Sequence, residues 1–126
     1  MESTNKQKIQ TFTDLIVWQE AHKLVLLVYQ VTRKFPREEI FGITSQMRRA
    51  AVSITSNLAE GFARRSKREK MQFYYIAKGS LVELESQLFI VRDIKYLECK
   101  NFELIYEQLS SSRRLLVAFI KSTNDL

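Results

Sequence analysis

The sequence predicts an all-α protein folded as an antiparallel up-down-up-down four-helix bundle. Its 126 residues include only three glycines and one proline, which are too few turn-forming residues for a sheet of many strands. Apolar residues also recur at spacings of three and four along most of the chain. At this length we expect one domain, residues 12–123, with short connections between its helices. Residues 1–11 carry no periodicity and are expected to form a disordered N-terminal tail.

The first helix is predicted to start at a cap on Thr13 or Asp14 and to end near Lys34, ahead of Phe35-Pro36. Its expected core stripe contains Leu15, Trp18, Ala21 or His22, Val25, Val28 or Tyr29, and Thr32. A second set of apolar residues lies on another part of the circumference: Val17, Leu24, Leu27 and Val31. A helix that is apolar over much of its girth buries more than one face. We therefore expect the second face to contact a neighbouring subunit.

The remaining elements follow from capping and periodicity. The connection from residue 35 to residue 43 should tuck Phe41 and Ile43 against the bundle, and Thr44 or Ser45 should cap the second helix. The apolar face of that helix is Met47, Ala51, Ile54, Leu58 and Phe62. The capping-box pattern of Ser66 and Glu69 starts a third helix at Lys67, which should run to about Tyr96. Asn101 should cap a fourth helix that frays after Ser122.

The second and third helices should form a hairpin with its tip near Arg65. Counting outward from that tip places Gly79 and Ser80 opposite Ala50 and Ala51. An internal glycine costs a helix about 1 kcal/mol relative to alanine, and a close approach of the two backbones at Gly79 would explain it. A leucine at this position should then overpack the hairpin. The same counting brings Glu83 near Arg48, where we expect an interhelical ion pair.

The hairpin tip is the densest charge feature of the chain. Between residues 64 and 70 there are five basic residues and one acid, Glu69; the basic ones are Arg64, Arg65, Lys67, Arg68 and Lys70. The net charge is +6, with a balance of +5 over residues 44–75 and of −3 over residues 81–110. Such asymmetry suits an acidic partner, of which nucleic acid is the commonest. We predict that these five residues and Arg49 contact phosphates; the alternative is a solvated tip that only confers solubility.

Other polar and aromatic residues near the hairpin leave two interpretations open. Tyr74 and Tyr75 can stack on unpaired bases or pack inside the bundle. Arg48 and Arg49 are expected to be structural, the first pairing with Glu83 and the second with a carboxylate on a neighbouring helix. A set of small polar and acidic residues on the second helix should form a network that fixes helix register, rather than a catalytic site: Ser53, Asn57 and Glu60. Glu60 also lies four residues before Arg64, in the favourable orientation for a helical ion pair.

Composition argues against catalysis, cofactors and membrane insertion. Cys99 is the single cysteine and His22 the single histidine, so no cluster has metal-ligand spacing. An enzyme needs an activated nucleophile or a positioned acid and base, and the sequence pattern supplies neither. No apolar run reaches the roughly 18 residues of a membrane span, and residues 1–10 contain no signal-peptide core. We expect a cytoplasmic protein that is not an enzyme and uses no cofactor.

Several short motifs resemble those of a known family. In the first half they are Phe12, Leu15, Trp18, Gln19, Ala21, Phe35-Pro36, Glu39 and Phe41-Gly42. The more specific ones are Ser45-Gln46, Arg48 to Ile54, Asn57, Ala59-Glu60-Gly61, Ser66, Ala77, Gly79-Ser80 and Glu83. Together they resemble the small four-helix-bundle proteins encoded in intervening sequences of bacterial 23S rRNA genes. Thr55 departs from the pattern, which usually carries proline there and a kink with it.

This resemblance implies a bundle that assembles into a homopentamer and binds RNA or DNA. Similar bundles are accessory proteins of diversity-generating retroelements, where a basic surface engages nucleic acid and a reverse transcriptase. From the residues and the resemblance together, the first functional hypothesis is a non-enzymatic, oligomeric nucleic-acid-binding protein, acting on RNA through its basic tip. The second is an oligomeric scaffold or adaptor that binds a protein partner.

Overall fold

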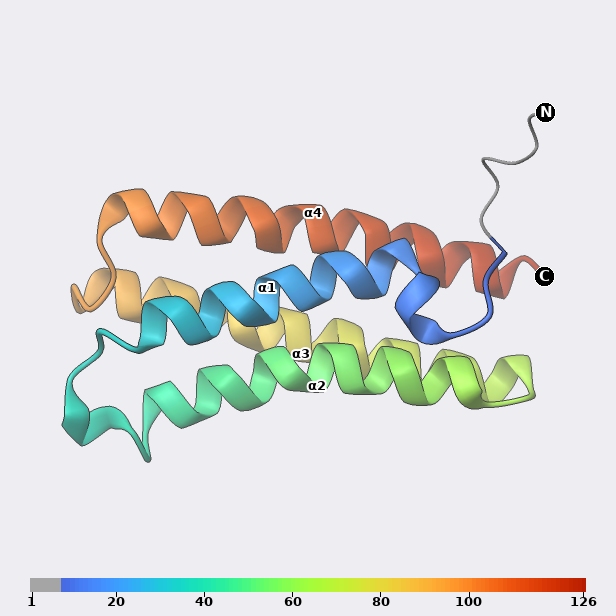
Figure 1. Ribbon diagram of the computed structural model, residues 1–126, viewed down its shortest axis with the longest axis horizontal. Coiled ribbons are helices and arrows are strands. Elements are labelled where there is room, and N and C mark those ends of the chain that lie inside the picture. The colour runs from blue at the N-terminus through green and yellow to red at the C-terminus, as the bar shows by residue number, and fades with distance from the viewer. Residues whose placement is uncertain (1–7) are drawn as a thin grey trace.

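The structure, a computed structural model, describes residues 8–126. Residues 1–7 of the expected N-terminal tail lie outside the described part. Four long helices run antiparallel to their neighbours (Figure 1): α1 (Ile16–Thr32), α2 (Ile43–Ala63), α3 (Lys67–Asp93) and α4 (Cys99–Asn124). Short 3₁₀ helices, η2 (Phe12–Asp14) and η3 (Arg37–Glu39), precede α1 and α2. The predicted all-α, up-down-up-down bundle is confirmed.

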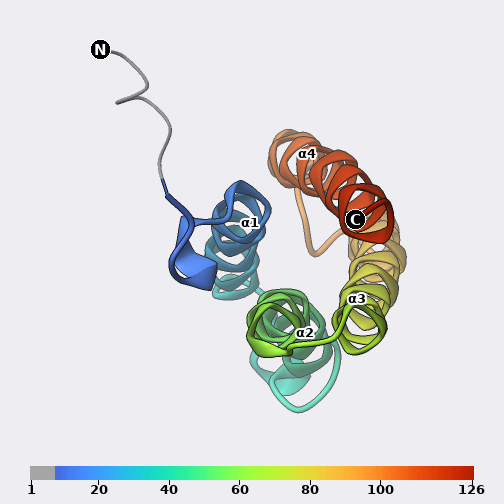
Figure 2. The ribbon, with the colours of Figure 1, turned by 90° about the vertical axis from the view of Figure 1, so that its right-hand side faces the viewer.

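The four helices surround a common axis in the view along the bundle (Figure 2), and their buried apolar side chains form one core. Each helix contacts its two neighbours, α4 packing against both α3 and α1. The connection between α2 and α3 lies at the same end as the C-terminus of α4 and the start of α1 (Figures 1 and 2). No helix within residues 8–126 is long and apolar enough to cross a membrane.

The chain enters the bundle through a capped 3₁₀ turn instead of a side-chain cap on α1. Thr11 caps η2, and the carboxylate of Asp14 accepts hydrogen bonds from the backbone N–H groups of Gln10 (2.9 Å) and Thr11 (3.1 Å). These two donors hold the pKa of Asp14 below its ordinary value. The side-chain cap predicted for α1 at Thr13 or Asp14 was therefore wrong, because Leu15 occupies the N-cap position of α1 and no side chain caps it. Residues 10 and 11, assigned to the tail, are tied to the domain.

The residues of the second apolar face predicted for α1 are mostly buried within the chain's own bundle. Val17 and Leu24 are buried in the core, and Leu27 and Val31 pack against it. α1 lies between α2 and α4, so residues on two sides of its circumference reach the same core. Burial of this face therefore needs no neighbouring subunit, and self-association of the chain stays a prediction.

The connection before α2 differs from prediction at both of its ends. Phe41 is 94% exposed rather than tucked against the bundle, while Ile43 is half-buried. Gly42, not Thr44 or Ser45, occupies the N-cap position of α2, and no side chain caps it. Instead, Glu39 accepts a hydrogen bond from the N–H of Ile43 (3.4 Å) and another from the Tyr96 hydroxyl (2.9 Å). One carboxylate thus links the start of α2 to the segment after α3.

The register of the α2–α3 hairpin is offset from the predicted one by about one helical turn. Ser53 and Ser80 share a hydrogen bond of 2.8 Å between their hydroxyls, which centres the hairpin between Ser66 and Lys67 instead of at Arg65. Moving the centre by one and a half residues shifts every facing pair by about three. The ion pair expected between Arg48 and Glu83 is consequently absent.

The close approach lies at Gly61 and not at Gly79. A Cβ built on Gly61 would lie 2.6 Å from Cε1 of Tyr74 and 2.9 Å from Cβ of Phe73, whereas one on Gly79 would meet no atom within 4 Å. The overpacking predicted for Gly79 was wrong, because this glycine faces outward from the bundle. Gly61 is therefore the position where close packing of α2 against α3 leaves no room for a side chain.

The C-terminal half also follows the expected order with shifted boundaries. α3 ends at Asp93, three residues before the predicted end, and Lys95 just beyond it adopts a left-handed φ of 69° that stops the helix. α4 starts at Cys99 with Glu98 at its N-cap, ahead of the cap expected at Asn101.

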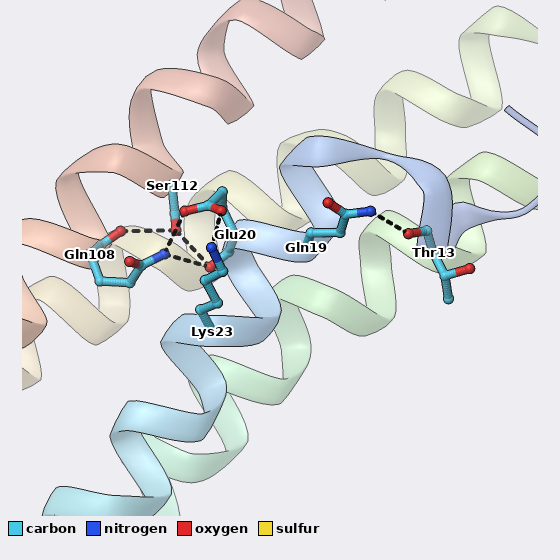
Figure 3. Close-up of polar contacts among 6 residues, drawn as sticks. All are labelled: Thr13, Gln19, Glu20, Lys23, Gln108 and Ser112. Carbon is cyan, nitrogen blue, oxygen red and sulfur yellow. Dashed lines mark hydrogen bonds and ion pairs between the residues drawn. The ribbon is translucent and has the colours of Figure 1, made fainter. Parts of the chain in front are cut away.

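Polar side chains join α1 to α4 across the bundle surface (Figure 3). The amide of Gln108 donates to the backbone carbonyl (2.9 Å) and the carboxylate (3.0 Å) of Glu20, and the Ser112 hydroxyl donates to the same carbonyl (3.2 Å). The hydrogen bonds of Lys23 and then Gln108 lower the pKa of Glu20. Gln19 closes η2 onto α1 by donating to the carbonyl of Thr13 (2.9 Å).

A second polar cluster joins α3 to α4 and predicts an acid-sensitive contribution to stability. Arg113 donates to both oxygens of Glu85 (2.6 and 3.1 Å), and the Tyr106 hydroxyl donates to one of them (2.7 Å). The hydrogen bond from Arg113 is the main reason that the pKa of Glu85 lies below its ordinary value of 4.5. A carboxyl with a lowered folded-state pKa stabilises the protein fully above its ordinary pKa, and this contribution is lost as the pH falls through the folded-state value.

We expect Glu85→Gln to lower the free energy of unfolding by about 1–2 kcal/mol at pH 7, because it removes a charge-assisted contact. At pH 3 the difference from the natural protein should shrink. Urea unfolding at the two pH values measures both quantities. An equal deficit at pH 7 and pH 3 would show that Glu85 contributes no pH-dependent stability.

Candidate nucleic-acid interface

The basic tip is the turn from α2 into α3, residues 64–70, as predicted. Arg64 follows the last residue of α2 with an extended backbone (φ −75°, ψ 154°), and α3 starts at Lys67. The Ser66 hydroxyl accepts a hydrogen bond from the N–H of Glu69 (3.1 Å), which satisfies one free donor of the new helix. This cap fixes a tight turn, so the basic side chains leave the bundle from a short, defined stretch of backbone.

The two lysines of the tip are held by backbone carbonyls at helix ends. Lys70 donates to the carbonyl of Phe62 (2.8 Å) and lies over its ring, and Lys67 donates to the carbonyls of Asn124 (3.0 Å) and Leu126 (3.1 Å). A cation near a helix C-terminus is favourable because the last carbonyls carry partial negative charge. The lysines therefore help to hold the ends of α2 and α4 at the tip.

The three arginines of the tip are exposed. Arg64 places its guanidinium over the ring of Phe73, 4.8 Å from the centroid, which orients it along the surface of the hairpin. For Arg65 and Arg68, no hydrogen-bond or ion-pair partner lies within residues 8–126. These two side chains are the ones most accessible to a ligand in solution.

No Asp or Glu side chain in the described part of the chain offsets the positive charge of the tip. The side-chain ion pairs there join Lys23 to Glu20, Arg92 to Asp93 and Arg113 to Glu85, and none of them involves residues 64–70. The pair expected between Glu60 and Arg64 is absent, because Arg64 lies outside the helix and turns toward Phe73. The tip thus presents a concentrated positive field at one end of the bundle.

The two tyrosines next to the tip have different environments. Tyr74 is buried against Phe119, with ring centroids 4.8 Å apart, and burial raises its pKa to about 12. Tyr75 is 54% exposed on the outer side of α3. Tyr74 therefore packs, and Tyr75 is the one whose ring is accessible to a base.

The other predicted site residues are divided between two sides of α2. Arg48 turns toward α1, where its Nε donates to the Thr32 hydroxyl (2.9 Å). Arg49 is exposed, and it lines a shallow hollow together with Glu83. Neither arginine forms an ion pair within residues 8–126. In the observed register Glu83 lies opposite Ala50, which agrees with its lining the same hollow as Arg49.

The polar residues of α2 form a small network with α3. Besides the bond between Ser53 and Ser80, the amide of Asn57 donates to the backbone carbonyl (2.8 Å) and the hydroxyl (3.0 Å) of Ser53. Glu60 is exposed and does not take part in this network. The arrangement links the two helices at one level and has the geometry of a register contact. No group of three or more His, Cys, Asp or Glu side chains that could hold a metal lies within residues 8–126.

Sequence reasoning missed the partners of the tip residues. The ring of Phe73 lies under the guanidinium of Arg64, and Phe73 faces Gly61 across the hairpin. A sequence prediction with the correct register would have placed Phe73 opposite Gly61. The carbonyls that hold Lys67 come from the end of α4, some 57 residues later in the chain. No side-chain pattern in the sequence signals a backbone acceptor at that distance.

Comparison with known proteins establishes the family of the chain. A family model described as 23S rRNA-intervening sequence protein matches residues 13–118. The chain belongs to this family. The resemblance found in the sequence motifs is thereby confirmed, whereas the likeness to accessory proteins of diversity-generating retroelements stays a prediction.

A solved structure has the same fold. It is the 1.70 Å crystal structure of a protein with unknown function from the S23 ribosomal protein family of Bacteroides thetaiotaomicron. The two chains share 20% sequence identity with a TM-score of 0.78, over 84% of this chain and 96% of the other. At this identity the likeness concerns the fold. No curated protein matches the chain.

Proposed function

We propose that this member of the 23S rRNA-intervening sequence protein family is a non-enzymatic nucleic-acid-binding protein whose basic tip, residues 64–70, contacts the phosphates of RNA. One observation supports it most: Arg65 and Arg68 are exposed at the tip without a carboxylate partner in the described chain. Lysines and arginines in such a position bind polyanions by releasing condensed counterions. Arg64, oriented by Phe73, and the accessible ring of Tyr75 extend the surface along α3.

Self-association is part of this proposal, and the pentamer of the family resemblance is its expected form. Exposed apolar side chains on the outer side of α3 support an interface, among them Ile76, Val82 and Ile90. Repeating a weak tip around a ring would raise the affinity for a long strand through effective concentration. Light scattering at micromolar concentration should give the mass of a pentamer, and a monomer mass would contradict this part of the proposal.

The alternative function, an adaptor for a protein partner, is favoured by one observation. Phe41 is 94% exposed and follows Ile40, which is 54% exposed, so an apolar pair projects at the end of the bundle opposite the tip. Paired apolar residues of this kind are common in protein interfaces. An adaptor should show little affinity for mixed RNA or DNA but should bind a specific protein in a pull-down, and Phe41→Ser should abolish that binding.

The proposed function is tested by fluorescence anisotropy with a labelled single-stranded RNA of mixed sequence, about 20 nucleotides long. We expect a dissociation constant in the range of roughly 10⁻⁴–10⁻⁶ M at physiological salt and tighter binding at lower salt. Parallel titrations with single-stranded DNA and double-stranded RNA identify the preferred strand. No binding of any of the three at about 50 mM salt would contradict the proposal.

A further inference from the structure

A second basic site lies in the N-terminal half of α2, away from the tip. An open hollow of about 480 Å³ is formed there between α2, α1 and the end of η3. The residues that matter for its chemistry are Tyr29, Ile40, Ser45, Arg48, Arg49 and Val52. We name it the arginine hollow. Arg48 and Arg65 are 17 positions apart, nearly all of them in α2, which corresponds to roughly 25 Å at 1.5 Å per residue.

Among residues 8–126, the groups that hold Arg48 in this hollow are neutral. Its Nε donates to the Thr32 hydroxyl (2.9 Å), and its guanidinium lies 4.6 Å from the centroid of the Tyr29 ring. Thr32 donates its own proton to the carbonyl of Val28 (2.7 Å), so its oxygen is left to accept from Arg48. These contacts orient the half-buried guanidinium but do not compensate its charge. Arg48 lines the hollow and uses only its Nε in the bond to Thr32, so its guanidinium is a prepared donor for an anion with two oxygens.

The lining of the hollow fits a phosphate better than a carboxylate. Arg49 supplies a second positive charge and Ser45 a hydroxyl donor, and no aspartate or glutamate is among the lining residues. A phosphate ester carries up to two charges and three oxygens, which matches two guanidinium groups and a hydroxyl, whereas a carboxylate offers one charge and two oxygens. Tyr29, Ile40 and Val52 form an apolar wall beside these donors. The volume is that of a small-molecule site.

We propose that the arginine hollow binds the phosphate group of a nucleotide, with Arg48 as the oriented donor and Arg49 as the second cation. The nucleoside would lie against the apolar wall. The phosphate could belong to a free nucleotide or to a strand of RNA. The site uses none of the tip residues, so the proposal does not rest on RNA binding by the tip.

Chemical-shift changes in the full-length protein test the site directly. Phosphate and adenosine monophosphate should each shift the backbone amides of residues 43–53, the mononucleotide at lower concentration, while adenosine alone should not. Saturation by adenosine monophosphate identifies a free nucleotide as the source. Shifts of the same amides only by a phosphorylated oligonucleotide identify the strand. The proposal is overturned if no phosphate-bearing probe moves these amides.

Two substitutions separate the hollow from general charge effects. Val52→Glu places a carboxylate on the rim of the hollow, where the side chain is 38% exposed, and leaves the contact between Arg48 and Thr32 in place. We expect the Val52→Glu variant to bind adenosine monophosphate with an affinity at least about tenfold lower than that of the natural protein. Val117→Glu, at a 45% exposed position on α4, changes the net charge equally and should bind as the natural protein does. Equal affinities in the two variants would overturn the proposal.

A third substitution keeps the charge but changes the donor geometry. Arg48→Lys should also weaken binding about tenfold, because an ammonium cannot make the paired hydrogen bonds of a guanidinium. The variant Arg65→Glu/Arg68→Glu should retain the mononucleotide affinity, which shows that the tip is not the site measured. If that variant loses RNA binding but still binds adenosine monophosphate, the lost RNA binding belongs to the tip, and the arginine hollow is a separate site.

Discussion

Reversing the charge of the two accessible tip arginines, in the variant Arg65→Glu/Arg68→Glu, is expected to weaken RNA binding at least about tenfold. Both side chains are exposed and neither has a partner within residues 8–126. Their replacement should therefore remove phosphate contacts without disturbing the fold. Replacing Lys67 or Lys70 would be less informative, since these lysines also hold the carbonyl ends of α4 and α2. Anisotropy titrations with the same RNA measure the change in affinity.

The matched control reverses two exposed charges at the opposite end of the bundle. Arg33→Glu/Lys34→Glu produces the same change in net charge, and both residues are exposed at the end of α1 (Figure 1). If the tip is the binding surface, this control should lose much less affinity than the tip variant. Equal reductions in affinity would mean that RNA responds to the overall charge and that no particular surface is involved.

The second large effect is expected at Gly61. Gly61→Ala should destabilise the protein by about 1–3 kcal/mol, because the new Cβ would overlap the ring of Tyr74. That ring cannot move aside easily, since it is buried against Phe119. The cost of overpacking should exceed the gain in helix propensity, which is at most about 1 kcal/mol. Urea unfolding with a two-state analysis gives the difference.

The same substitution at Gly79 is expected to have the opposite sign. No atom lies within 4 Å of a Cβ placed there, and neither glycine has a positive φ. Gly79→Ala should therefore raise the free energy of unfolding by up to about 1 kcal/mol through helix propensity alone. If Gly79→Ala were destabilised and Gly61→Ala were not, the result would contradict the observed register and support the one predicted from the sequence, with its close approach at Gly79.

Periodicity was sufficient to predict the four helices and their order. The three- and four-residue spacing of apolar residues indicates which side of a helix faces the core, and it identified the buried residues Met47, Ala51, Ile54 and Leu58 of α2. The start of α3 was also placed correctly, because Ser66 caps it locally. These signals depend on residues within one or two turns of each other.

Register and loop packing could not be predicted in the same way. Arg65 is the middle of the connection between α2 and α3, but the facing pairs also depend on how the two helices are placed against each other, and the contact between Ser53 and Ser80 shows that they are shifted by nearly a turn. Phe41 was expected to be buried because it is apolar, yet a connection has no periodicity that orients its side chains. For the tip, composition predicted its charge, but which cations stay accessible depends on carbonyls contributed by the ends of α2 and α4.

The dependence of RNA affinity on salt tests the central claim most directly. The slope of log Kd against log salt concentration reports the number of phosphates that the protein neutralises. The variant Arg65→Gln/Arg68→Gln should give a shallower slope than the natural protein, by about 0.7 for each phosphate of a single strand that the variant no longer neutralises. Parallel lines for the two proteins would show that Arg65 and Arg68 do not contact phosphate and would contradict binding through the tip.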